Sequence, residues 1–350
     1  VDYDGTASSL LVEPERTNEV TYSEDFTQWT RQALTVSANS IVSPDGNSNA
    51  DSIVGDGTSG SHYILQSFTV VSSEDYTVSI FAKAGTNDFL QVILGAAPFG
   101  SSNYCNFDLS SGSIGSFGAA SFNRFIEPFG NGWYRLGFTA TALSSGSANV
   151  FPTLITSSTS VFLESNTLDT SIEVYGGSLE AGSYATSYIP TSGSTVTRIK
   201  DQYSKTGISN LINSEEGVLF VEISALANEN TVREISINDG SIFNRISIYY
   251  TASVIYAKWQ GASGGIDLFH TVSNITDYHK VALKYKSGDT SLWVNGLEVS
   301  TSSSVNSTSG LNVLDFDRAD GNNYFFGKVK QLQVFKTALT DTELATLTTI

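Results

Sequence analysis

Short runs of alternating apolar and polar residues, each followed by Gly, Ser, Asn or Pro, recur along this chain and restrict its fold more than any other feature. Residues 75–83 place Tyr76, Val78 and Ile80 on one side of such a run, and residues 280–285 alternate in the same way. A period of two is typical of a strand with one buried face. The many short runs predict an all-β fold of two tandem jelly-roll type β-sandwiches with a short C-terminal helix.

The last residues of the chain carry the helix signal. The Thr340 hydroxyl can accept a hydrogen bond from the first turn, and Glu343 can bond back to the Thr340 amide, which together form a capping box. Leu339, Leu344 and Leu347 then share one helical face. We expect this helix to cover a sheet edge.

The length of 350 residues exceeds what one hydrophobic core usually serves, which predicts two domains. A strand that begins at Ile172 meets Gly176 and Gly177, where a ladder is expected to end, and the Ser, Thr and Gly that follow Pro190 are typical of a linker. We therefore expect an extended arm, a first sandwich and a second sandwich over residues 1–20, 21–195 and 196–350.

Composition limits the ligands that the chain can bind. The formal net charge is −17, and only 15% of the residues are charged. Phosphate contacts need clustered Lys and Arg, so we expect no binding to nucleic acid or to an anionic membrane surface. No apolar run is long enough for membrane insertion. Neutral ligands, or ligands bridged by a cation, are favoured.

The residues needed for catalysis do not form a recognisable set. Cys105 is the only cysteine and sits in a strand-like run, which is typical of a small buried residue. None of His62, His270 and His279 lies in a nucleophile elbow or beside a cysteine. The string of three acids that sandwich glycosidases carry on one strand is also missing. We therefore predict that the chain is not an enzyme.

Four motifs in the first half resemble those of sandwich modules found repeatedly in bacteriophage tail and head fibre proteins. They are LLVEPERTN at residues 10–18, YSEDFTQW at 22–29, GNGWYR at 130–135 and LEAGSYATSYIP at 179–190. The resemblance implies a carbohydrate-binding-module-like β-sandwich that forms part of a virion.

The N-terminal arm carries Leu10, Leu11 and Val12, which have no core of their own to enter. We expect these side chains to be buried against the first sandwich or against a neighbouring subunit. In the fibre family such an arm often packs against a neighbouring segment, and fibres present weak binding sites in several copies. The resemblance thus implies a homo-oligomer, and we expect a trimer.

The second half resembles the concanavalin-A-like or laminin-G-like lectin sandwich. The resemblance rests on the hairpin at Val294, Asn295 and Gly296, the strand that follows Phe326, and the ending ALTDTE at residues 338–343. The Asn-Gly pair itself predicts a tight turn with positive φ. In the laminin-G-like relatives a calcium ion at the rim with a sugar nearby is common.

Two groups of residues are candidate binding sites. Asp315, Asp317 and Asp320 bring carboxylates to one strand end and loop, which is the ligand chemistry that Ca²⁺ prefers, although a solvated acidic turn is an open alternative. Sugar rings stack on aromatic faces while polar side chains bind their hydroxyls. We predict such a ligand site at Trp259, Tyr256 and Asp267, because Trp259 precedes a Gly-rich loop.

Together these features predict a non-enzymatic fibre or spike module on the virion surface, outside the cell, that binds host-surface polysaccharide or glycan and contacts other virion proteins. One alternative is a structural spacer or capsid decoration protein without sugar binding. The other is a carbohydrate-binding appendage of a secreted polysaccharide-degrading enzyme, which would place the chain in a secreted or cell-surface protein.

Overall fold

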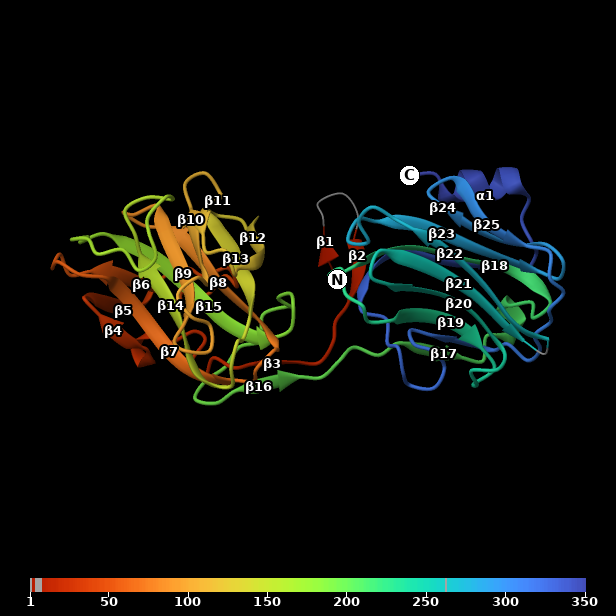
Figure 1. The fold of residues 1–350 in the computed structure, drawn as a ribbon, viewed down its shortest axis with the longest axis horizontal. Helices are drawn as coiled ribbons and strands as arrows, with labels where there is room; N and C mark the ends of the chain where they lie inside the picture. Colours follow the sequence, from red (N-terminus) through yellow and green to blue (C-terminus); the bar gives the residue numbers. More distant parts are fainter. Residues whose placement is uncertain (1, 4–7, 262) are drawn as a thin grey trace. The chain divides into compact units, whose positions relative to one another are not determined.

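The computed structural model describes residues 2–3, 8–261 and 263–350, and the fold is nearly all-β (Figure 1). The chain divides into two compact units. The first unit is Glu15–Ile199, and the second unit joins Val1–Pro14 to Lys200–Ile350. No helix in the described part of the chain is long and apolar enough to cross a membrane. The predicted all-β class with two sandwiches is confirmed.

The first unit is a sandwich of two six-stranded sheets. Their strand orders are β11-β10-β9-β14-β7-β4 and β12-β13-β8-β15-β6-β5, and β3 pairs separately with β16. The elements are β3 (Arg16–Asn18), η1 (Phe26–Gln28), β4 (Thr30–Gln32), β5 (Leu34–Ile41), β6 (Ala50–Gly55), β7 (His62–Val70), β8 (Asp75–Ala84), β9 (Phe89–Gly95), β10 (Tyr104–Asp108), β11 (Ser113–Phe117), β12 (Phe122–Pro128), β13 (Trp133–Thr141), β14 (Gly146–Leu154), β15 (Ser171–Ala181) and β16 (Val196–Arg198).

The alternation predicted for β8 is the reason that this strand forms the middle of its sheet. Tyr76, Val78 and Ile80 point into the core between the sheets and are at most 5% exposed. Burying one face in this way removes apolar surface from water, while the other face carries Thr77 and Ser79.

The second unit packs a seven-stranded sheet, β1-β2-β27-β18-β23-β24-β25, against a six-stranded sheet, β17-β26-β19-β20-β21-β22. The elements are β1 (Asp2–Tyr3), β2 (Ser8–Val12), β17 (Ser204–Thr206), η2 (Ser209–Leu211), β18 (Glu216–Ala225), β19 (Arg233–Asn238), β20 (Arg245–Thr251), β21 (Val254–Gly261), β22 (Gly264–Thr271), β23 (His279–Lys286), β24 (Thr290–Val294), β25 (Leu297–Ser302), β26 (Val313–Asp315), β27 (Gly327–Phe335) and α1 (Asp341–Thr348).

The N-terminal segment departs from the expected arm. Strand β2 pairs with β27 of the second unit, with Leu10 opposite Val329, and Val12 is fully buried in the core of that unit. Without β2, strand β27 would leave a row of backbone groups unpaired. We expected Leu10, Leu11 and Val12 to be buried against the first sandwich or a neighbouring subunit, and Val12 is instead buried in the second unit of the same chain.

The unit boundaries also differ from the expected ones. The chain passes between units at residues 14–15 and 199–200, whereas the sequence suggested residues 20–21 and 195–196. The cause is long-range pairing: Val196, Thr197 and Arg198 form a ladder with β3 and so belong to the first unit. Local composition carries no information about such a partner.

The C-terminal helix has the predicted cap. The Thr340 hydroxyl accepts a hydrogen bond from the Glu343 amide, and the Glu343 side chain bonds back to the Thr340 amide. Leu344 is fully buried against a group of side chains on the outer side of the seven-stranded sheet, Val218, Phe220, Ala282 and Trp293. The helix therefore covers a sheet face, not the edge that we expected.

Two of the four motifs noted in the sequence, those at residues 10–18 and 179–190, meet at Asn18, which is fully buried. Its Nδ2 donates to the carbonyls of Gly177 (3.1 Å) and Ile189 (2.8 Å), and its Oδ1 accepts from the amides of Val20 and Leu179, both at 3.1 Å. One side chain thus ties the N-terminal motif to the motif at residues 179–190. These hydrogen bonds join the beginning of the first unit to its end.

Candidate functional site

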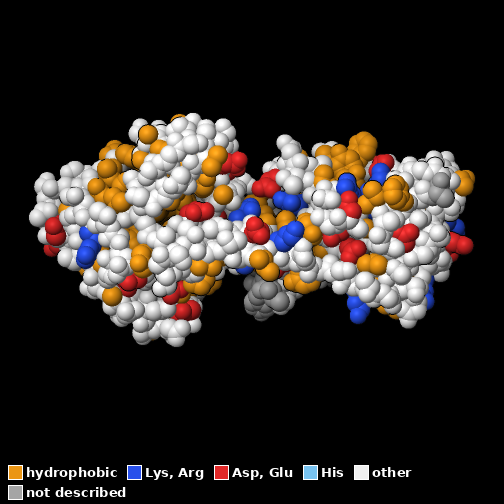
Figure 2. Space-filling model, turned by 90° about the horizontal axis from the view of Figure 1, so that it is seen from below, with side chains coloured by type: hydrophobic (Ala, Val, Ile, Leu, Met, Phe, Trp, Pro, Cys, Tyr) orange, Lys and Arg blue, Asp and Glu red, His pale blue; other side chains and the backbone are white. Residues whose placement is uncertain are grey.

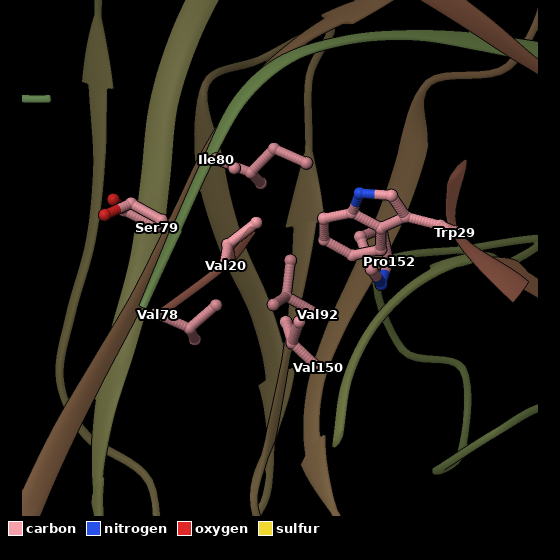
Figure 3. Close-up of a pocket in the computed structure, with 10 residues that line it drawn as sticks. Val20, Trp29, Val78, Ser79, Ile80, Val92, Val150 and Pro152 are labelled. Carbon is pink, nitrogen blue, oxygen red and sulfur yellow. The ribbon is translucent and has the colours of Figure 1, made fainter. Parts of the chain in front are cut away.

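The cavity drawn in Figure 3 lies in the core of the first unit, and its lining is mostly apolar. Trp29, Val78, Val92 and Val150 are among the side chains around it. The space open to the centre of a water-sized sphere is about 10 Å³, which is room for about one water molecule. This cavity is a packing defect of the core and is too small for a sugar ring.

The tryptophans are all buried, so none is a stacking platform on the surface. Trp29, Trp133, Trp259 and Trp293 are at most 6% exposed. Trp259, the first choice from the sequence, is 0% exposed, lies edge-on to Tyr285, and donates from its indole to the Thr308 hydroxyl at 3.3 Å. The predicted ligand role of Trp259 is corrected: it is a core residue.

The reason is the alternation of β21. Ile255, Ala257 and Trp259 share the side that packs into the core of the second unit, and Tyr256 and Lys258 share the other side. Residues three apart on a strand lie on opposite faces. Tyr256 and Trp259 therefore cannot contact one ligand together.

The outer side of β19, β20, β21 and β22 carries a different set of residues. We call this surface the aromatic face and define it by Glu234, Ser236, Arg245, Ser247, Tyr249, Tyr256, Lys258, Gln260, Asp267 and Phe269. Their strand neighbours Ile235, Ile246, Ile255 and Ile266 point into the core. Antiparallel pairing arranges the aromatic face in rows across the four strands.

One row is aromatic. The register places Glu234 opposite Tyr249, Tyr249 opposite Tyr256, and Tyr256 opposite Phe269. The rings of Tyr249 and Tyr256 are stacked, with centroids 4.8 Å apart, and the ring of Phe269 lies 6.0 Å from that of Tyr256. Phe269 is 61% exposed, so its ring extends the apolar surface of the two tyrosines into solvent.

The neighbouring row is polar. It runs through Ser236, Ser247, Lys258 and Asp267 by the same register. The Lys258 ammonium donates to both carboxylate oxygens of Asp267, at 2.7 and 2.9 Å. Polar groups therefore lie one row away from an aromatic platform, which is the arrangement that sugar recognition requires.

The exposure of both rows increases towards β22. Glu234 and Ser236 on β19 are buried, Tyr256 and Lys258 on β21 are half-buried, and Asp267 on β22 is exposed. The chain after β26 contributes to this burial, because the Ser236 hydroxyl donates to the carbonyl of Asp317 at 2.8 Å. The accessible part of the aromatic face is therefore made by β21, β22 and Tyr249 of β20, while Arg245 and Ser247 of β20 are buried.

The buried end of the aromatic face contains an ion pair, a tyrosine phenol and a serine hydroxyl. Arg245 Nε lies 3.0 Å from Glu234 Oε1, and these side chains are 9% and 2% exposed. Burial, together with the charges of Asp267 and Glu234, raises the pKa of Tyr249 to about 12, so its phenol stays neutral and able to donate. The Ser247 hydroxyl is buried and has no hydrogen-bond partner among the described residues.

Of the predicted ligand residues, Tyr256 and Asp267 lie on the aromatic face and Trp259 does not. Sequence reasoning missed Tyr249 and Phe269. The signal for them was present, because Tyr249 and Phe269 have the outward parity on their own strands, and hairpin pairing with β21 places both beside Tyr256.

The acidic residues predicted to hold calcium are occupied by protein donors. Asp315 accepts from the Asn238 amide at 2.8 Å, Asp317 accepts from the backbone amide of Ala319, and Asp320 pairs with Arg318 at 2.6 Å. The described residues contain no group of three or more His, Cys, Asp or Glu side chains that could hold a metal ion. A calcium ion would have to compete with these donors, and the calcium site stays a prediction.

Cys105 carries a thiol, which is a potential nucleophile, but its surroundings do not favour the reactive thiolate. It is fully buried, and this burial raises the pKa of its thiol to about 12. A thiol with such a pKa forms little thiolate near neutral pH. The prediction that Cys105 is a small buried core residue is confirmed.

A comparison with protein families finds a likeness for part of the second unit. Residues 219–345 match the family model described as the concanavalin A-like lectin/glucanases superfamily. The match runs from β18 into α1, so the likeness to this superfamily covers most of the second unit. No curated protein matches the chain.

Solved structures that resemble parts of the chain include a sialidase module, a trans-sialidase and a toxin domain. The CBM40 of the Ruminococcus gnavus IT-sialidase, bound to α2,3-sialyllactose, is 16% identical with a TM-score of 0.35. The match covers 42% of this chain and 98% of that chain. The leech intramolecular trans-sialidase is 18% identical with a TM-score of 0.37, covering 43% of this chain and 26% of that chain. The binding domain of botulinum neurotoxin serotype G is 12% identical with a TM-score of 0.34, and the match covers 41% of this chain and 39% of that chain. Such TM-scores carry no argument about the ligand of this chain.

Proposed function

We propose that this chain is a non-enzymatic adhesion module of a bacteriophage fibre or spike and that the aromatic face of its second unit binds glycans on the host surface. The observation that carries the proposal is the row of Tyr249, Tyr256 and Phe269 beside a polar row, on a lectin-like sandwich. The phage assignment rests on the four fibre-like motifs of the first half of the sequence.

The aromatic face carries both kinds of group that contact a sugar. Pyranose rings have apolar C–H faces that stack on aromatic rings and hydroxyls that bind polar side chains. The side chains of Lys258, Gln260 and Asp267 supply such polar groups around Tyr256. On the side of the molecule shown in Figure 2, acidic and basic side chains are scattered among uncharged polar groups.

A single site of this kind binds weakly, so the proposal includes several copies. Repeated sites gain avidity without any new contact, provided that they engage one surface together. We propose a homo-oligomer, with a trimer as the simplest case, held on the outside of the virion by other virion proteins. Imaging of the intact particle tests this part: a position buried inside the particle, with no exposed second unit, would contradict it.

The test of the function is a glycan array probed with the chain displayed in multiple copies, for example on streptavidin. We expect binding to a subset of glycans and competition by the free oligosaccharide. An array that gives no signal, followed by no binding to host-cell polysaccharide, would overturn the glycan proposal and favour the structural spacer. Release of sugar from any bound glycan would overturn the non-enzymatic part.

A further inference from the structure

We propose that the aromatic face selects uncharged sugars over sugars that carry a carboxylate, and that Asp267 sets this selectivity. The inference rests on the proposed glycan-binding function and names the class of glycan. It is carried by one property of the aromatic face: each of its basic side chains is already paired with a carboxylate of the protein.

Arg245 is held by the fold. Its Nε lies 3.0 Å from Glu234 Oε1, and its Nη1 donates to the Ile242 carbonyl at 2.5 Å. The Arg245 and Glu234 side chains are 9% and 2% exposed, so a ligand reaches neither without displacing protein atoms. Breaking a buried ion pair is costly because it leaves a buried charge without a partner. Arg245 is therefore unavailable to a sugar carboxylate.

Lys258 is the accessible cation, and Asp267 occupies it. The ammonium contacts both carboxylate oxygens, at 2.7 and 2.9 Å, while the Lys258 side chain is 19% exposed and that of Asp267 is 48% exposed. The outer group of the pair is thus the anion. A ligand on this face therefore reaches the carboxylate more readily than the ammonium.

The chain that includes and follows β26 brings one further ion pair and one further carboxylate. Arg318, beyond the Glu234 end, donates to Asp320 at 2.6 Å, and Asp315 adds another carboxylate next to Ser236. The charged residues of the aromatic face are Glu234, Asp267, Arg245 and Lys258, which cancel. A carboxylate is bound most strongly by a cation that is free to contact it, and the arrangement offers an exposed anion instead.

A neutral sugar meets no such conflict. Its hydroxyls can donate to the Asp267 carboxylate and accept from the Lys258 ammonium, while its C–H face covers Tyr256 and Phe269. The ion pair then offers the sugar one acceptor, Asp267, and one donor, Lys258, and its net charge is zero. In this arrangement Asp267 contributes to binding and also excludes an anionic group from Lys258.

The experiment compares paired glycans on one array: each neutral oligosaccharide beside the same chain with a sialic acid or uronic acid added. The protein is the full chain, displayed in multiple copies, as wild type, Asp267→Asn, and the matched control Glu298→Gln. Glu298 is an exposed acid on β25, outside the aromatic face, so the control loses the same charge elsewhere. The double variant Asp267→Asn with Lys258→Met tests whether any gain comes from Lys258.

We expect the wild type to bind the neutral member of each pair and the Asp267→Asn variant to gain binding to the carboxylated member. An exposed charge pair predicts a gain of about two- to fivefold per site, which decreases as the salt concentration rises. Glu298→Gln and the double variant should show no gain. A wild type that prefers the carboxylated member, or an Asp267→Asn variant with unchanged selectivity, would overturn this inference and leave glycan binding intact. Binding to neither member by any variant would overturn the proposed function itself.

Discussion

The phenol rings of Tyr249 and Tyr256 lie parallel on the outer side of β20 and β21, with centroids 4.8 Å apart and planes 2° from parallel. They are directly opposite in the register, and Phe269 continues the row on β22. The platform is therefore built from three hydrogen-bonded strands. Strand-borne sites hold their geometry more tightly than sites carried by loops.

Replacement of Trp259 by Ala should destabilise the second unit strongly. A fully buried Trp leaves a large cavity, and such changes cost about 3–5 kcal/mol in the free energy of unfolding. Denaturant unfolding of the variant measures this loss. As a control, Phe269→Ala should change the free energy of unfolding by less than about 0.5 kcal/mol, because its side chain is largely exposed. Equal stability of both variants would contradict the assignment of Trp259 to the core.

Replacement of Asn18 by Ala should destabilise the first unit. The change removes four hydrogen bonds and leaves the buried amides of Val20 and Leu179 without their acceptor. Each unsatisfied buried group costs about 1–3 kcal/mol, so we expect a loss of at least about 2 kcal/mol. Thr17→Ala, one residue away on the same strand, removes only an exposed contact to Thr197 and should cost far less. Similar losses for both would show that Asn18 has no special role in closing the unit.

Glu180 should make the stability of the first unit depend on pH. Burial raises the pKa of Glu180 above its ordinary value of 4.5. The folded state then binds the proton more tightly than the unfolded state, so the free energy of unfolding falls as pH rises from the ordinary pKa to the folded one. Glu180→Gln cannot ionise and should gain stability relative to wild type over this window. Urea unfolding of both proteins between about pH 4 and about pH 7 measures the difference, and a constant difference would refute this expectation.

The calcium prediction for Asp315, Asp317 and Asp320 has a direct thermal test. An ion bound to the folded state raises the melting temperature of the second unit by mass action, and a chelator reverses the shift. Burial raises the pKa of Asp317, and the charges of Asp315 and Asp320 add to the effect, so a bound cation would relieve repulsion there. It must also displace Arg318 from Asp320. The Asp317→Asn variant is the matched control and should lose any rise in melting temperature that Ca²⁺ gives the wild type. If saturating Ca²⁺ does not change the melting temperature of the wild type, the acidic turn is a solvated loop.

The parts of the fold that depend on local pattern could be predicted from the sequence. The alternation of Tyr76, Val78 and Ile80 gave a buried strand face, and the Thr340 and Glu343 spacing gave the helix cap. The parts that depend on distant partners could not. Nothing near Leu10 indicates that its strand pairs with β27, more than three hundred residues away.

Only part of the candidate site could be predicted from the sequence. Parity along β21 separates Tyr256 from Trp259, and strict use of it would have removed Trp259 from the predicted site. The rows of the aromatic face needed more than parity. They depend on which strands are neighbours and on their register, and the Tyr249 and Phe269 partners of Tyr256 follow only once both hairpins are in place.

The measurement that tests the central claim most directly is glycan binding by the Tyr256→Ala variant of the full chain, displayed in multiple copies, beside the wild type. An aromatic contact contributes about 0.5–1.5 kcal/mol, so we expect about a two- to tenfold loss of affinity per site and a larger loss of avidity. Phe129→Ala, which removes an exposed ring from the first unit, is the matched control and should bind as wild type does. Unchanged glycan binding by a folded Tyr256→Ala variant would contradict the assignment of the aromatic face as the glycan site.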